Sequence, residues 1–136
     1  MKVFISHAHG DEHLAQKVAA AIRDAGLDVF DMYSDVLPGE NWAAQSSRAL
    51  AESDAMVVLL TPESVHSKNV EYEVGYALGK IDYKGRVFPV IAASPGELDP
   101  REIPWILKHF QTLELPGRDP DANSLQRLTN VLATAA

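Results

Sequence analysis

Apolar and polar residues follow two different rhythms along this chain. Five short stretches are rich in β-branched and other apolar residues, and we predict that each is a β-strand. These stretches are residues 3–5, 27–30, 56–60, 87–91 and 110–113. The third stretch is apolar throughout, which is typical of a strand that is buried on both faces of a sheet.

Between these stretches, apolar residues recur at the spacing of one helix face. The predicted helices cover residues 11–25, 42–51, 70–81 and 124–133. Asp11 stands at the expected N-cap of the first helix, and Gly26 at the position that follows its last turn. Strands that alternate with helices predict a parallel sheet with helices on both faces. Ligands of such sheets bind beyond the carboxyl ends of the strands, so we expect the site at the loops 6–11, 31–41 and 61–69.

Length, charge and cysteine content narrow the classes of function. The 136 residues fit one domain. Lys and Arg number 12 against 19 Asp and Glu, and the net charge of −7 argues against binding to nucleic acid or to an anionic membrane. The absence of cysteine excludes disulfides, thiolate metal sites and a cysteine nucleophile. No apolar run reaches the ~18–20 residues of a membrane span, and the N-terminus turns polar too early for a secretory signal, so we expect a cytoplasmic protein.

A histidine-rich segment, SHAHGDEH at residues 6–13, follows the first predicted strand. It is similar to the H-x-H-x-D-H zinc motif of some hydrolases, in which histidines and an aspartate hold a metal ion that activates water. Glu12 separates the aspartate from the last histidine, and this breaks the spacing of the motif. Only His66 and His109 remain to complete such a site. We therefore predict that the protein holds no metal.

Two glutamates, Glu71 and Glu73, stand in the first turns of the helix predicted at 70–81. At 100° per residue they fall on opposite shoulders of the apolar face, each roughly 80° from its centre, so periodicity does not choose between them. The alternatives are a functional carboxylate and compensation of the helix dipole, which favours glutamate in a first turn. Gly75 and Gly79 each cost the helix roughly 1 kcal/mol relative to alanine. Such a cost suggests close packing of the helix backbone or a nearby ligand.

Five stretches occur in the order and spacing of one protein family. They are VFISH at 3–7, the strand at 27–30 with LPG at 37–39 and Trp42, the strand at 56–60 with TP at 61–62, SKNVEYE at 67–73, and VFPV at 87–90. Together they resemble a bacterial TIR (Toll/interleukin-1 receptor) domain over essentially the whole chain. The resemblance implies a single flavodoxin-like, three-layer α/β domain over residues 1–136, with a central parallel five-stranded sheet and helices on both faces.

The resemblance also implies an activity and a site. In TIR enzymes the glutamate that ends the motif S-x-W-x-x-x-E is catalytic, and Glu73 holds that position here. This implies release of nicotinamide from NAD by hydrolysis or cyclisation, in antiphage defence or signalling, with NAD as substrate and no cofactor. One carboxylate is able to stabilise the positive charge that develops on the ribose. The residues expected to bind substrate are Ser6, His7, His9, Phe30, Asp31, Trp42, Ser67 and Asn69.

Two other functions stay open at this point. Many TIR domains only assemble with other TIR domains, among other surfaces through the loop that is 31–41 here, and self-association is expected for the enzyme as well. The stretch 69–77 also resembles nucleoside deoxyribosyltransferases, which likewise cleave an N-glycosidic bond with a glutamate. The expected partners are therefore NAD or a related nucleotide and other TIR domains, and neither nucleic acid nor a membrane.

Overall fold

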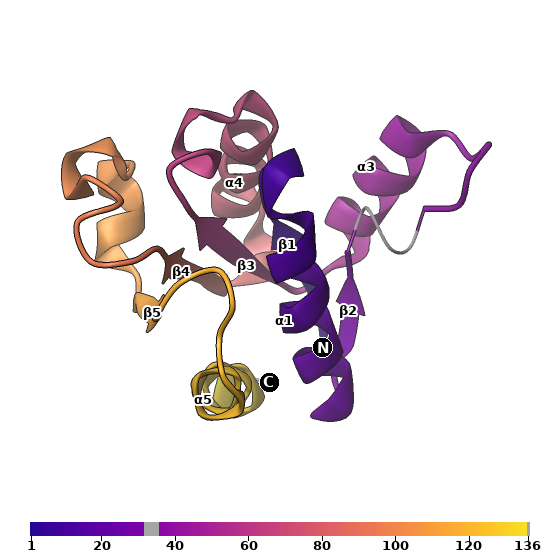
Figure 1. The fold of residues 1–136 in the computed structure, drawn as a ribbon. Helices are drawn as coiled ribbons and strands as arrows, with labels where there is room; N and C mark the ends of the chain where they lie inside the picture. Colours follow the sequence, from indigo (N-terminus) through magenta and orange to yellow (C-terminus); the bar gives the residue numbers. More distant parts are fainter. Residues whose placement is uncertain (32–35, 136) are drawn as a thin grey trace.

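The computed structural model of this chain describes residues 1–31 and 36–135, apart from the side chain of Trp42. One parallel sheet has the strand order β2-β1-β3-β4-β5 (Figure 1). The strands are β1 (Lys2–Ser6), β2 (Asp28–Phe30), β3 (Ala55–Leu60), β4 (Val87–Ala92) and β5 (Leu113–Leu115). The helices are α1 (Glu12–Asp24), α3 (Trp42–Glu52), α4 (Lys68–Gly79) and α5 (Ala122–Ala135). The expected fold class, a flavodoxin-like α/β domain with a five-stranded parallel sheet, is confirmed.

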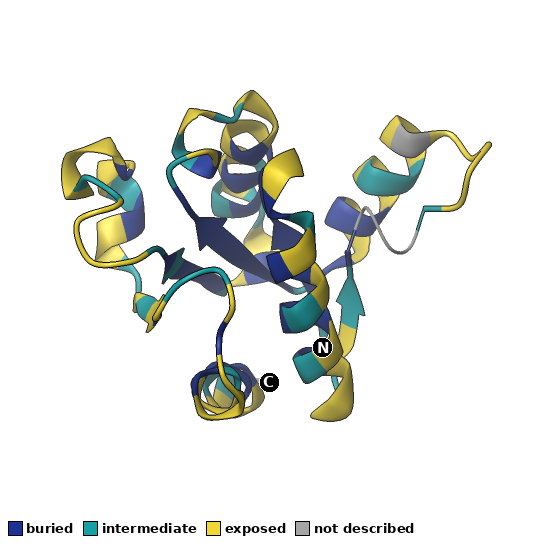
Figure 2. Cartoon of the chain, in the orientation of Figure 1, coloured by how far each residue is buried: buried dark blue, intermediate teal, exposed yellow. Residues whose placement is uncertain are grey.

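Helices cover both faces of the sheet, because successive side chains of a strand point to opposite faces. On one face, α1 and α5 share a hydrophobic cluster with alternate residues of the strands, such as Ile5 and Val57. On the other face, α3 and α4 share a second cluster with the residues in between, such as Phe4 and Met56. All of β3 is buried, as the apolar run at 56–60 predicted, and Figure 2 shows the central strands β1, β3 and β4 mostly in the dark blue of buried residues.

The carboxyl ends of β1 and β3 lie side by side at the centre of the sheet, with Ser6 in register with Val58. The chain leaves β1 towards α1 on one face, whereas it leaves β3 towards α4 on the other face. Such a reversal opens a crevice at the carboxyl ends of the two strands, where sheets of this kind bind their ligands. The loops 6–11 and 61–69 therefore meet where the sequence pattern placed the site.

Two predicted boundaries were wrong. Helix α4 ends at Gly79 rather than at residue 81, because Lys80 has an extended backbone and a separate 3₁₀ turn, Ile81–Tyr83, follows. Ile81 is 88% exposed and takes no part in the buried face of the helix. The last strand is β5 at Leu113–Leu115 rather than residues 110–113, because Leu113 is the first residue that pairs with β4, opposite Val90.

The turn after α1 follows the prediction. Gly26 has a φ of +85°, and its backbone N–H donates to the carbonyl of Arg23 at 2.9 Å. Glycine adopts this left-handed conformation without the steric cost that a Cβ brings, so it ends the helix and turns the chain into β2.

Within residues 1–31 and 36–135, no helix is both long enough and apolar enough to cross a membrane.

Candidate active site

The structure distinguishes the two glutamates of α4. Glu73 lies on the buried side of the helix, between Val70 and Ala77, and only 5% of it is exposed. Glu71 is exposed and lines a cavity of about 300 Å³ between α4 and the segment 104–107. Helical periodicity did not distinguish Glu71 from Glu73, whereas the packing of α4 on the sheet does. The buried carboxylate is that of Glu73.

Ser6 is the last residue of β1, and it connects the strand to this carboxylate. It shares the sheet face of Phe4, on which α4 packs, because alternate residues of a strand point to the same side. Its hydroxyl donates to Glu73 Oε1 at 2.7 Å, and the serine is completely buried. The contact joins two residues that are 67 positions apart in the chain.

Burial changes the acidity of Glu73. Removal from water disfavours the charged carboxylate and raises the pKa of Glu73 from 4.5 to about 7, although the Ser6 hydrogen bond and the nearby His7 oppose this effect. Both the protonated and the ionised forms of Glu73 are therefore present near neutral pH. A carboxyl group of this kind at a ligand-binding edge is a candidate catalytic residue.

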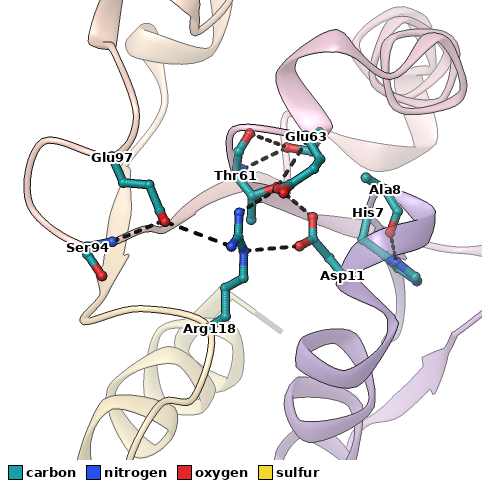
Figure 3. Close-up of polar contacts among 9 residues, drawn as sticks. His7, Ala8, Asp11, Thr61, Glu63, Ser94, Glu97 and Arg118 are labelled. Carbon is teal, nitrogen blue, oxygen red and sulfur yellow. Dashed lines mark hydrogen bonds and ion pairs between the residues drawn. The ribbon is translucent and has the colours of Figure 1, made fainter.

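His7 follows Ser6 and is held on both sides of its ring. Nε2 lies 2.9 Å from Asp31 Oδ1, and Nδ1 lies 2.8 Å from the carbonyl oxygen of Ala8 (Figure 3 shows the second contact). The Ala8 carbonyl and an ionised Asp31 are both acceptors, and this arrangement favours an imidazolium, in which both ring nitrogens donate. Burial by itself lowers the pKa of His7, but the hydrogen bonds to Asp31 and Ala8 and the charges of Asp31 and Glu73 outweigh it and raise the pKa above its ordinary value.

A second polar cluster, which the sequence did not predict, lies on the α1 side of the same edge (Figure 3). The carboxylate of Asp11 accepts from the Thr61 hydroxyl at 2.5 Å and lies 3.4 Å from Arg118 Nε. Arg118 also forms ion pairs with Glu63 and, at 3.9 Å, with Glu97. The four loops after β1, β3, β4 and β5 each contribute to it, so no local pattern could have predicted it.

This cluster corrects the expected role of Asp11. Asp11 stands at the N-cap position of α1, but its side chain makes no capping hydrogen bond. It is buried instead, and burial raises its pKa, which the Thr61 hydrogen bond and the Arg118 charge partly oppose. Asp11 therefore ties α1 to the loop after β3.

The other predicted binding residues are placed as follows. His9 is exposed in the 3₁₀ turn His9–Asp11. The ring of Phe30 is stacked on that of Phe4, with the centroids 5.7 Å apart and the planes at 20°. Ser67 caps α4 and accepts from the backbone N–H of Val70 at 3.3 Å, and Asn69 is exposed in the first turn of that helix. The side chain of Trp42 lies outside the part that the structure describes.

Ser6, His7, Asp31 and Glu73 are thus the predicted residues that the fold brings together, at the carboxyl ends of β1 and β2. Ser67 and Asn69 lie at the N-terminus of α4, where Asn69 is about one helical turn before Glu73.

Close packing does not explain the two helical glycines. A Cβ built at Gly75 or at Gly79 would meet no atom within 4 Å, so this part of the expectation was wrong. Gly75 lines the same cavity of about 300 Å³ as Glu71.

The structure also shows where the histidines of the zinc-like segment 6–13 lie. The two ring nitrogens of His7 contact Asp31 and Ala8, and His13 is exposed on α1. Among the residues with a described placement, no group of three or more His, Asp or Glu side chains is arranged to hold a metal ion.

The strand order defines a doubly wound α/β domain, and the buried carboxylate marks a candidate site at the carboxyl end of β1. The sequence matches the TIR domain family over residues 3–129, and the chain belongs to that family. No curated protein matches the chain significantly.

Several solved structures share the fold. The metazoan TIR-STING receptor from C. gigas, in complex with 2′,3′-cGAMP, has a TM-score of 0.74 and 19% identity, over 96% of this chain and 38% of the receptor chain. This chain thus spans less than half the length of that receptor. The TIR domain of the Toll-related receptor TRR-2 from Hydra magnipapillata has a TM-score of 0.66 and 18% identity, over 98% and 94% of the two chains. A CMP N-glycosidase from Clostridium botulinum has a TM-score of 0.61 and 13% identity, over 96% and 99%.

Proposed function

We propose that this TIR domain cleaves the bond between nicotinamide and ribose in NAD, with Glu73 as the catalytic carboxylate. The observation that carries the proposal is the burial of Glu73 at the carboxyl end of β1, where its Oε1 accepts a hydrogen bond from Ser6. A buried carboxylate is costly to the fold, and its place at the ligand-binding edge of the sheet supports a functional reason for that cost.

The chemistry needs only one carboxylate. In NAD the nicotinamide ring is a cationic pyridinium, so the C–N bond breaks with its electron pair moving to the ring nitrogen, and nicotinamide leaves as a neutral molecule. No general acid is required for this departure. The ribose that remains has oxocarbenium character, and ionised Glu73 stabilises that positive charge.

Two acceptors lead to two products. Water that attacks the ribose carbon gives ADP-ribose and releases a proton, whereas a hydroxyl or an adenine nitrogen of the same molecule gives a cyclic product. Both routes share the first step, so they depend on Glu73 to the same degree. We propose a role in antiphage defence or signalling for either product, as the family resemblance implies, together with self-association of the domain.

The fold supports cleavage of a bond between a base and a sugar. A CMP N-glycosidase has the same arrangement of strands and helices over 96% of this chain. At 13% identity the likeness is one of fold, and the proposal for this chain therefore rests on Glu73 and its contacts.

The test compares wild-type protein with Glu73→Gln at high protein concentration, with NAD as substrate and chromatographic separation of the products. Glutamine keeps the shape of the side chain and its contact with Ser6 but carries no charge. We expect nicotinamide release by the wild type and a loss of at least about 100-fold in the variant. Glu71→Gln, an exposed position on the same helix, is the matched control and should keep its activity.

Equal rates for wild type and Glu73→Gln would contradict the assignment of Glu73. Absence of nicotinamide release by wild-type protein at every concentration would favour the second candidate, a TIR domain that only assembles with other TIR domains. CMP as an alternative substrate tests whether the base is nicotinamide.

A further inference from the structure

His7 and Asp31 were expected to bind substrate, but their geometry points to a different role. Their side chains are both completely buried, and Nε2 of the histidine lies 2.9 Å from the carboxylate. The second ring nitrogen donates to the carbonyl of Ala8. Because both ring N–H groups are used within the protein, the imidazole has no donor left for a ligand.

The pair forms a bridge between two elements of the site. His7 follows Ser6, whose hydroxyl donates to Glu73, and Asp31 follows β2 at the start of the loop 31–41. The ring of His7 contacts the carboxylate of Asp31, and its charge interacts with that of Glu73, which accepts from the preceding residue, Ser6.

We infer that Asp31 acts through His7: it holds His7 as a cation beside Glu73, and this cation keeps a catalytic share of Glu73 ionised at neutral pH. Asp31 and His7 are thus positioning residues rather than substrate ligands. The catalytic part of the inference rests on the proposed function, whereas the charge on His7 does not.

Other charged and titratable groups around the pair do not replace this cation. Asp11, from the turn before α1, is an acid whose charge also interacts with His7. Tyr83, from the turn after α4, donates its hydroxyl to the carbonyl of Leu50, and burial raises its pKa, so the hydroxyl stays neutral. Among the described residues, His7 favours the ionised carboxylate of Glu73 by its charge, and Ser6 favours it by its hydrogen bond.

The charge on His7 is tested directly by nitrogen NMR of histidine-labelled wild-type protein at pH 7. We expect both ring nitrogens of His7 to be protonated, with titration at a pH above that of an ordinary histidine. In Asp31→Asn, which keeps the shape but not the charge, His7 should titrate at lower pH. A single protonated nitrogen on wild-type His7 at pH 7 would overturn the inference, whether or not the protein cleaves NAD.

The effect on catalysis is tested by the pH dependence of nicotinamide release. A nearby cation lowers the pKa of a carboxyl group by about 1 to 3 pH units, so its loss should raise the pKa of Glu73 above 7 and leave at least about fivefold less ionised Glu73 at pH 7. We expect Asp31→Asn and His7→Gln to lose about tenfold in kcat at pH 7 and to recover to within about twofold of wild type near pH 9. Asp28→Asn, an exposed aspartate at the other end of β2, is the matched control and should follow the wild-type profile.

If Asp31→Asn lowered kcat/KM by the same factor at every pH, through a higher KM, the result would overturn the inference in favour of direct substrate binding. The NMR measurement and the activity measurement distinguish a failure of this inference from a failure of the proposed function. Wild-type protein that carries a cationic His7 but releases no nicotinamide refutes the proposed function alone.

Discussion

Substitution of Glu73 by glutamine should stabilise the protein at alkaline pH. The carboxyl group ionises at about 7 in the folded chain, against 4.5 for an unperturbed glutamate. Between these two values the folded chain still holds a proton that the unfolded chain has released. The stability of the wild type therefore falls as the pH rises through this window, and the loss is complete above about pH 7.

The size of the effect follows from the difference in pKa. At about 1.4 kcal/mol for each pH unit, the change from 4.5 to about 7 corresponds to about 3 kcal/mol. Glutamine does not titrate, and its Oε1 still accepts from Ser6. Glu73→Gln should thus exceed the wild type by less than about 1 kcal/mol near pH 5 and by about 3 kcal/mol at pH 8.

The assay is urea unfolding of both proteins from pH 5 to pH 8, followed by circular dichroism. With a urea dependence of about 2 kcal/mol per molar, the midpoint of the variant should lie about 1–2 M higher at pH 8. Glu71→Gln, on the exposed side of α4, is the control and should change stability by less than about 0.5 kcal/mol. Unfolding curves of wild type and Glu73→Gln that differ by the same amount at every pH would refute the reasoning.

Three further predictions concern stability and are checked by the same unfolding measurement. Tyr83→Phe removes a buried hydroxyl that donates to the carbonyl of Leu50 at 2.6 Å, and should cost about 1–2 kcal/mol; an unchanged midpoint would show that the carbonyl finds another donor. Ser67→Ala removes the cap of α4 on the N–H of Val70 and should cost about 1 kcal/mol, whereas Ser67→Asn should restore most of it. Gly26→Ala places a Cβ at a φ of +85° and should cost about 1–2 kcal/mol, and a gain in stability would contradict the observed turn.

Local patterns predicted the fold class because they depend on neighbouring residues. The apolar run at 56–60 requires burial on both faces, and β3 is buried throughout. Gly26 relieves the steric cost of a left-handed turn, and it stands at such a turn. These features are set by periodicity and backbone sterics, which act within a few residues of the chain.

The same local patterns failed where an apolar residue serves a purpose other than the expected one. Phe110 suggested a strand, but its side chain packs against the cluster under α4, and pairing with β4 begins only at Leu113. Ile81 suggested another turn of α4, yet it is 88% exposed beyond the end of the helix. The hydrophobicity of a residue indicates that its side chain tends to be buried, but it does not indicate which element covers that side chain.

The sequence by itself determined the order of the elements, the central buried strand and the two glutamates among which the site had to be sought. Periodicity left Glu71 and Glu73 equal and the family resemblance favoured Glu73; the tertiary structure gave the physical difference, because the packing of α4 on the sheet sets which shoulder of the helix is buried. The fold also brings His7 and Asp31, two of the residues expected to bind substrate, into direct contact in the interior. Contacts between residues 24 or 67 positions apart are created by strand order, and strand order is a property of the folded chain as a whole.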